Sequence, residues 1–99
     1  MDTKKDILDF LKQNRRYLSD KYHISKIALF GSFAKNKQHD ESDVDILIDI
    51  EEGTENIHEL KLSLKNYLSN AFGRKVDLAR EKYLKSYAKK YILKDAIYV

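Results

Sequence analysis

The sequence contains no cysteine and no proline, and it has only three glycines. The absence of cysteine excludes disulfide bonds, thiolate metal sites and cysteine nucleophiles, and it agrees with a reducing compartment. Because glycine occurs only at Gly31, Gly53 and Gly73, each of these residues is expected to mark the end of an element.

Long hydrophobic runs are also absent. The longest apolar runs, residues 27–30 and 46–48, are far shorter than the roughly 20 residues that a membrane span needs. The first residues do not resemble the apolar core of a signal peptide. We therefore expect a cytoplasmic protein that does not associate with membranes.

The remaining composition is that of a soluble globular protein. Hydrophobic residues make up 42% of the 99 residues and charged residues 35%, which predicts a single folded domain over residues 1–99. The formal net charge of +3 is too small to indicate nucleic-acid binding by itself.

Hydrophobic periodicity predicts alternating helices and strands. The expected fold is α/β (α+β), a small mixed sheet of about three strands flanked by helices in the order α-β-α-β-α-β-α. The expected elements are a helix over 3–18 capped by Asp2 or Thr3, a strand over 24–30, one possible helical turn after Gly31-Ser32, a strand over 43–50, a helix over about 55–72 capped by Thr54 and ended by Gly73, a strand over 75–79, and an amphipathic terminal helix.

The strand over 43–50 carries alternating side chains. Its alternation puts Asp43, Asp45 and Asp49 on one face and the isoleucines on the other. The long helix that follows is suited to a crossover between parallel strands, whereas the short link before it favours an antiparallel first pair. These pairings would bring Gly31-Ser32, Asp43, Asp45 and Asp77 to one sheet edge. Asp49 would lie too far along the strand, and we expect it to be solvated.

Three carboxylates at one edge suit a magnesium site. Mg²⁺ prefers hard oxygen ligands. Two such ions about 3.5–4 Å apart can activate the attacking hydroxyl and neutralise the charge on the leaving pyrophosphate. Asp43, Asp45 and Asp77 are therefore the candidate metal ligands and catalytic residues, and Asp77 could also take a proton from an acceptor hydroxyl.

The Gly31-Ser32 turn offers backbone N–H groups and a hydroxyl to a triphosphate. Lys35, Lys37 and Arg74 are near enough in the sequence to contribute positive charge. Of these, Lys35 is grouped with Gly31 and Ser32 as a candidate nucleotide-binding residue.

These residues resemble a known family. Gly31-Ser32, ten intervening residues and Asp43-Val44-Asp45 resemble the Gly-Ser-x₁₀-Asp-x-Asp signature of the DNA polymerase β nucleotidyltransferase superfamily. Residues 31–48, GSFAKNKQHDESDVDILI, are similar to its minimal, MNT-type branch, and residues 73–78, GRKVDL, resemble the strand with the third aspartate. The sequence differs from many members of the family at Phe33, Lys35 and Asn36. These differences concern the details of the phosphate-binding loop and not the metal site.

The resemblance implies ATP as the nucleotide donor and Mg²⁺ as the metal. Many minimal members are paired with a HEPN-domain RNase toxin and transfer AMP to one of its tyrosines. The resemblance therefore implies an antitoxin in a hetero-oligomer, with nucleic acid reached only through the partner. Two alternatives remain: an antitoxin that neutralises its partner by binding without catalysis, and an RNA-end nucleotidyltransferase.

The last 20 residues combine tyrosines with lysines. Tyr83, Tyr87 and Tyr91 recur at helical spacing, which favours packing in the core, although aromatic residues are also enriched at protein interfaces. Tyr98 is the expected partner contact. The lysines between positions 82 and 94 are expected to form a solvated face, with a basic patch as the alternative.

Overall fold

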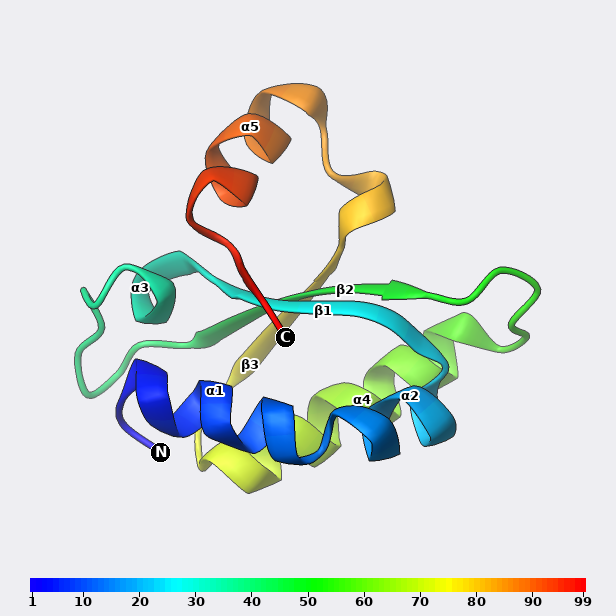
Figure 1. The fold of residues 1–99 in the computed structure, drawn as a ribbon, viewed down its shortest axis with the longest axis horizontal. Coiled ribbons are helices and arrows are strands. Elements are labelled where there is room, and N and C mark those ends of the chain that lie inside the picture. Colours follow the sequence, from blue (N-terminus) through cyan, green and yellow to red (C-terminus); the bar gives the residue numbers. More distant parts are fainter.

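A four-stranded mixed sheet forms the centre of the computed structural model, which describes residues 1–99 (Figure 1). None of its helices has the length and apolar character to cross a bilayer. The elements in chain order are α1 (Lys4–Gln13), α2 (Arg15–Tyr22), β1 (Ile24–Phe30), α3 (Gly31–Ala34), β2 (Val44–Ile50), α4 (Ile57–Phe72), β3 (Val76–Arg80), the 3₁₀ helix η1 (Glu81–Tyr83), α5 (Ser86–Asp95) and β4 (Ile97–Tyr98).

The strands lie in the order β3-β2-β1-β4. β1 and β2 pair antiparallel, and α4 connects β2 to the parallel strand β3. Both pairings confirm the arrangement predicted from the connection lengths. The end of β1 and the starts of β2 and β3 therefore share one edge of the sheet.

The sheet has one strand more than the three identified in the sequence. β4 pairs antiparallel with β1 through Ala28–Tyr98 and Leu29–Ile97, and the Val99 N–H donates to the Ile27 carbonyl at 3.0 Å. A two-residue strand is too short to show alternation, so periodicity cannot reveal it.

The helix predicted over residues 3–18 is in fact two helices. Thr3 caps the first as predicted, because its Oγ1 accepts from the Asp6 N–H at 3.1 Å. Asn14 then leaves the helical conformation, and its side chain donates back to the Phe10 carbonyl at 2.9 Å. Asparagine competes for backbone groups in this way, which explains the break. α2 continues to Tyr22, beyond the predicted end.

The ends of α4 show one wrong prediction and one confirmed. Thr54 does not cap the helix; its hydroxyl donates to the Glu51 carbonyl at 2.6 Å within a turn. The preceding residue is Asn56, which adopts a left-handed conformation without a side-chain cap. Gly73 ends α4 with φ +66°, as a glycine in the left-handed region does.

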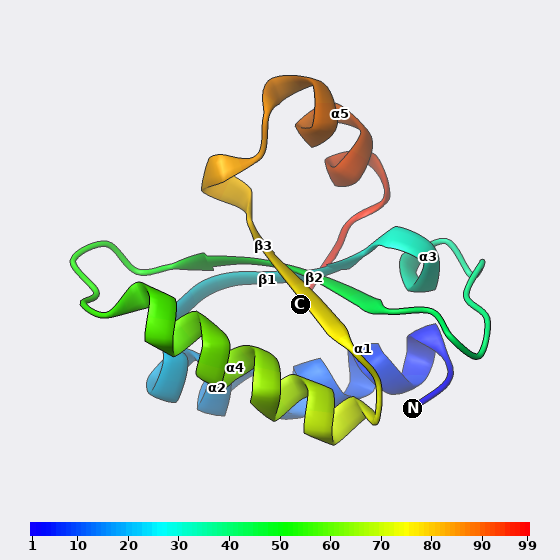
Figure 2. The ribbon, with the colours of Figure 1, turned by 180° about the vertical axis from the view of Figure 1, so that it is seen from behind.

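The two faces of the sheet carry different layers. Helices α1, α2 and α4 cover one face, and α5 lies over the other (Figures 1 and 2). The main core lies under the three helices and includes the predicted inward face of β2. Its members include Ile7, Leu11, Leu18, Ile27, Leu29, Val44, Ile46, Ile48, Ile50, Leu64, Leu68, Phe72 and Val76. Full burial of each such side chain contributes about 1.5–3 kcal/mol.

The prediction that the tyrosine stripe packs in the core is wrong. Tyr83, Tyr87 and Tyr91 are 67%, 70% and 75% exposed, and α5 contains no buried residue. The same helix leaves Ala88 and Ile92 half-buried. A broad apolar stripe contains both sets, and periodicity alone does not show which edge of the stripe turns inward.

Candidate functional site

Three carboxylates come together at the edge predicted from the sequence. Asp43 directly precedes β2, and Asp45 lies near the start of that strand. The register pairs Asp45 with Asp77 on β3 and with Phe30, the last residue of β1. The strand pairing therefore fixes the backbone positions of all three aspartates next to the turn at Gly31.

Gly31 contacts the central carboxylate directly. It has φ +74°, and a Cβ atom at this position would lie 2.0 Å from Asp45 Oδ2. Only glycine combines this conformation with so close an approach. α3 begins here, and the Ser32 carbonyl accepts the Lys37 N–H at 2.9 Å, which holds the turn closed.

The environment of Asp45 disfavours its charge. Burial, followed by repulsion from Asp77 and then from Asp43, raises the pKa of Asp45 from 3.8 to about 6. The one cation near these carboxylates within ion-pair distance is Lys75, whose Nζ lies 3.9 Å from Asp43 Oδ2. A divalent cation bound among the aspartates would relieve this repulsion.

The residues present fit Mg²⁺ in their chemistry. Carboxylate oxygens are its preferred ligands. Burial, and after it repulsion from the neighbouring aspartates, raises the pKa of Asp45, and a bound cation would offset this cost. The side chains are not gathered around one point, since no group of three Asp, Glu, His or Cys side chains has the spacing to hold an ion. Asp43, Asp45 and Asp77 therefore stay predicted ligands, which metal binding would have to draw together.

Arg74 holds the loop that leads into Asp43 instead of facing the phosphate site. Its side chain is only 10% exposed, and its guanidinium lies 5.1 Å from the centre of the Phe33 ring. Every guanidinium nitrogen has an acceptor. Nη1 donates to the carbonyls of His39, Asp40 and Ser42 (3.2, 2.9 and 3.1 Å), Nε to the Met1 carbonyl (2.9 Å) and Nη2 to Asp2 Oδ1 (2.8 Å).

The two lysines predicted to contribute charge near the phosphate, Lys35 and Lys37, lie in different surroundings. Lys35 Nζ lies 3.8 Å from Asp95 Oδ2, with both side chains close to half exposed. Lys37 is exposed, and nothing directs its side chain toward the carboxylates. Sequence reasoning missed both Lys75 and Asp95. The parallel register would have put Lys75 beside Asp43, but no signal in the sequence places α5 against α3.

A small cavity of about 200 Å³ adjoins the Gly31 turn. It lies between α3 and α5, and its lining combines apolar groups with one ion pair. The lining residues are Phe30, Gly31, Lys35, Tyr91, Ile92 and Asp95.

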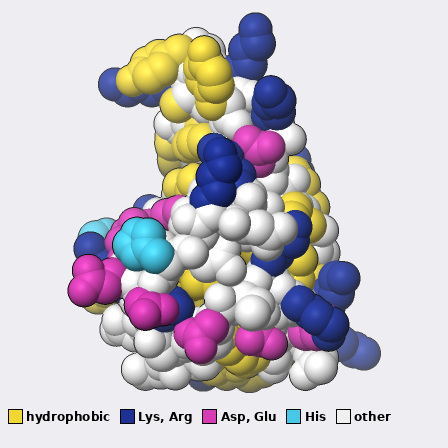
Figure 3. Space-filling view, turned by 90° about the vertical axis from the view of Figure 1, so that its left-hand side faces the viewer, with side chains coloured by type: hydrophobic (Ala, Val, Ile, Leu, Met, Phe, Trp, Pro, Cys, Tyr) yellow, Lys and Arg dark blue, Asp and Glu magenta, His cyan; other side chains and the backbone are white.

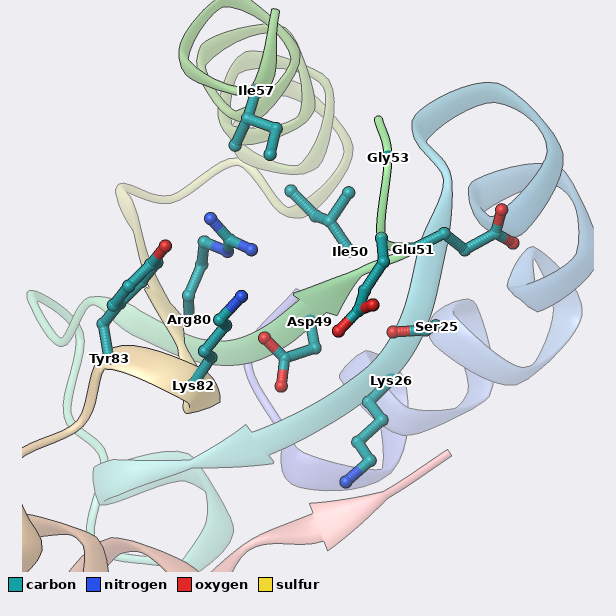
Figure 4. Close-up of a pocket in the computed structure, with 11 residues that line it drawn as sticks. Ser25, Lys26, Asp49, Ile50, Glu51, Gly53, Ile57, Arg80, Lys82 and Tyr83 are labelled. Atoms are coloured by element: carbon teal, nitrogen blue, oxygen red, sulfur yellow. The ribbon is translucent and has the colours of Figure 1, made fainter. Parts of the chain in front are cut away.

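The largest cavity, about 830 Å³, lies at the other end of the strands (Figure 4). It is bordered by the start of β1, the ends of β2 and β3, and η1. Asp49 is half-buried there, and its Oδ1 has no hydrogen-bond partner, so the expectation of a solvated Asp49 is wrong. Arg80 Nε, also in the lining, is likewise buried without a partner.

The chain matches a known protein family over most of its length. The family described as "Nucleotidyltransferase domain" matches residues 11–99. The chain belongs to this family. This nucleotidyltransferase is 43% identical over 101 residues to a Methanocaldococcus jannaschii protein named "Putative protein adenylyltransferase MJ1217", and the match covers all of both chains.

Two solved structures share the fold. One, described as "Structure of putative minimal nucleotidyltransferase", is 28% identical with a TM-score of 0.74, over 98% of this chain and 95% of that chain. The other, a toxin-antitoxin structure with AMP-PNP, has a TM-score of 0.70 at 24% identity, over 88% of this chain and 69% of that chain. The nucleotidyltransferase is thus of the minimal type that its sequence resembles.

Proposed function

We propose that this nucleotidyltransferase transfers AMP from ATP to a hydroxyl group of a partner protein, and that the partner is a HEPN-type RNase toxin which the chain neutralises. Two similarities support the proposal: the name of the relative, a protein adenylyltransferase, and the toxin-antitoxin structure that contains an ATP analogue. The acceptor in this proposal is a tyrosine of the toxin.

The triphosphate would bind at the turn between β1 and α3. Gly31 lets the backbone come close, and the N–H groups at the start of α3 and the Ser32 hydroxyl can donate to phosphate oxygens. Lys35 stands beside this turn and would exchange its pairing with Asp95 for a phosphate. Asp43, Asp45 and Asp77 would hold the metal.

The reaction forms one bond and breaks one. The acceptor oxygen attacks the α-phosphorus of ATP, and the bond from that phosphorus to its bridging oxygen breaks, so that pyrophosphate leaves with the electron pair. Asp77, the most exposed of the three aspartates, would take the hydroxyl proton. Bound Mg²⁺ supplies charge neutralisation for the triphosphate and the leaving group.

The observation that carries this proposal is the contact between Gly31 and Asp45. A phosphate-binding turn and a carboxylate that resists ionisation lie in van der Waals contact, at the edge that Asp77 shares. A purely structural acidic cluster would not require a glycine turn at the start of a helix to lie against it.

The test is the intact mass of a candidate partner after incubation with this chain, Mg²⁺ and ATP. The protein encoded by the adjacent open reading frame is the first candidate. We expect a gain of one or more AMP masses, and no gain with Asp43→Ala/Asp45→Ala. An unchanged mass with the wild-type chain, despite binding, would contradict catalysis.

A binding-only antitoxin is the second candidate function. It is favoured by the absence of a preassembled three-ligand metal set. Asp45→Asn distinguishes the two functions, because inhibition by binding requires one chain per toxin and survives the substitution. Neutralisation by catalysis needs less than one chain per toxin, and Asp45→Asn would abolish it.

A further inference from the structure

The exposed tyrosines form a surface that the proposed reaction does not use. Tyr87 and Tyr91 lie four residues apart on α5, and Tyr83 lies just before the helix in η1. All three are at least two-thirds exposed. Figure 3 shows hydrophobic side chains gathered at the end of the molecule that α5 forms, next to lysines and arginines. Such a cluster of aromatic side chains on a soluble protein indicates an interaction site.

The exposed charges on the segment that carries these tyrosines, residues 82–95, are almost all positive, although Glu51 and Glu52 line the cavity beside Tyr83. Five exposed lysines surround them, and the only acidic residue of α5, Asp95, is paired with Lys35. We call the tyrosines and these lysines together the Tyr–Lys face. The lysines are Lys82, Lys85, Lys89, Lys90 and Lys94.

The Tyr–Lys face continues into the largest cavity. Tyr83 and Lys82 line that cavity, and the Arg80 guanidinium lies 4.8 Å from the centre of the Tyr83 ring. The same cavity contains the unpartnered Asp49 Oδ1 and Arg80 Nε.

We propose that the Tyr–Lys face is the docking surface for a protein partner with an apolar groove bordered by aspartates and glutamates. Aromatic anchors spaced four residues apart on a helix are typical of helix-in-groove recognition. The acidic border is the charge complement of five lysines. The identity of the partner as the toxin rests on the proposed function.

Two other occupants fit the same face less well. A second copy of this chain, docked symmetrically, would bring like-charged lysines together. Single-stranded nucleic acid stacks its bases about 3.4 Å apart, whereas residues four apart on a helix are separated by about 6 Å, so successive bases would not meet successive rings.

Binding is measured by calorimetry with the purified product of the adjacent open reading frame, without ATP. Tyr83→Ser/Tyr87→Ser should weaken binding by about tenfold or more, as expected for aromatic anchors. The matched control is Leu62→Ser, which removes a 54% exposed apolar side chain from α4, on the opposite face of the sheet, and it should leave the affinity unchanged. Thermal melting verifies that every variant is folded.

A second pair of variants tests the charge. Lys85→Glu/Lys89→Glu should weaken binding and reduce its dependence on salt. Lys12→Glu/Arg16→Glu makes the same change in net charge on α1 and α2, where both side chains are exposed, and should have little effect.

The outcomes separate this proposal from the proposed function. Equal affinity of Tyr83→Ser/Tyr87→Ser and wild type, or no binding by the wild type, overturns the docking surface. So does a result in which the substitutions abolish binding of an oligoadenylate but not of the protein. Asp45→Asn, tested beside them, should bind normally and fail to transfer AMP; if it transfers AMP, the catalytic proposal fails and the docking surface stands.

Discussion

The helices on the two faces of the sheet differ in how much of their surface they bury. α1, α2 and α4 contribute side chains that are inaccessible to solvent, including Ile7, Leu11, Leu18 and Leu68. α5 contributes no buried residue and turns two tyrosines outward. The three-helix layer therefore supplies most of the stability, and packing constrains the surface of α5 less.

The two ends of the strands differ in a second way. At the Gly31 end, burial and repulsion from Asp77 and Asp43 disfavour the charged form of Asp45. At the Asp49 end, both acidic and basic side chains line a larger cavity. The proposed nucleotide site is therefore not at the larger cavity, because it was located by the convergence of the reacting groups and not by cavity size.

The largest expected effect is on the rate of AMP transfer and not on stability. Asp45→Asn should lower the rate of AMP transfer by at least about a thousandfold, since metal ligands contribute several kcal/mol to transition-state stabilisation. The measurement is the rate of partner adenylylation at saturating Mg²⁺ and ATP. Asp40→Asn, at an exposed loop position, is the control and should react at the wild-type rate.

The next effect compares the two helical layers directly. Leu68→Ala, at a fully buried position of α4, should lower the free energy of unfolding by about 2–5 kcal/mol. Tyr87→Ala, on α5, should change it by less than about 0.5 kcal/mol. Urea denaturation followed by circular dichroism measures both. Comparable losses for the two variants would show that α5 shares the stabilising role.

Gly31→Ala should act on the site more than on the fold. The added Cβ would displace the Asp45 carboxylate, and a misplacement of about 1 Å can reduce a rate about a hundredfold. Gly53→Ala is the matched control, because Gly53 also has positive φ (+81°) but has no atom within 4 Å of the added Cβ. Both variants should lose stability through the positive φ, Gly31→Ala more because of its contact with Asp45, and only Gly31→Ala should lose transfer activity.

Arg74→Lys should have a smaller effect, through the position of Asp43. A lysine cannot reproduce the hydrogen bonds that join the loop before Asp43 to Met1 and Asp2. We expect a loss of transfer of about tenfold, with a higher Mg²⁺ concentration needed for half-maximal rate. Arg16→Lys on the exposed side of α2 is the control. An unchanged Mg²⁺ requirement would assign Arg74 to stability alone.

Much of the carboxylate edge could be predicted from the sequence because it depends on local rules. Alternation in β2 put Asp43 and Asp45 together, and the length of α4 identified the parallel pairing that brings Asp77 beside them. Gly31 was recognisable because a glycine and a serine end an apolar strand. These inferences needed only strand geometry and connection lengths.

The features that were missed depend on contacts between distant segments. Arg74 carries no signal that it will bond to Met1 and to the loop before Asp43. The exposure of the α5 tyrosines has the same origin, whereas the break at Asn14 comes from a local hydrogen bond to Phe10 that periodicity does not reveal. In each case several conformations satisfy the local pattern, and tertiary packing selects one of them.

The smallest expected effect concerns stability and pH. In the folded chain Asp45 has a pKa of about 6, against 3.8 as its ordinary value, so the folded state binds more protons between these values. Stability contributed by this residue is therefore fully present below about pH 4 and is lost as the pH rises through 6. Asp45→Asn removes the charge, and without Mg²⁺ at pH 7 it should be more stable than wild type by about 1 kcal/mol, since solvent screens a half-buried carboxylate.

Thermal melts at pH 4 and pH 7 with a chelator measure this difference. The advantage of Asp45→Asn should shrink toward zero at pH 4, where the wild-type carboxyl is protonated as well. Adding Mg²⁺ at pH 7 should stabilise the wild type and not the variant, because the ion binds only where its ligands are charged. If Asp45→Asn is the less stable protein at pH 7 without Mg²⁺, then the aspartates do not repel one another, and the cost that a metal ion would remove does not exist.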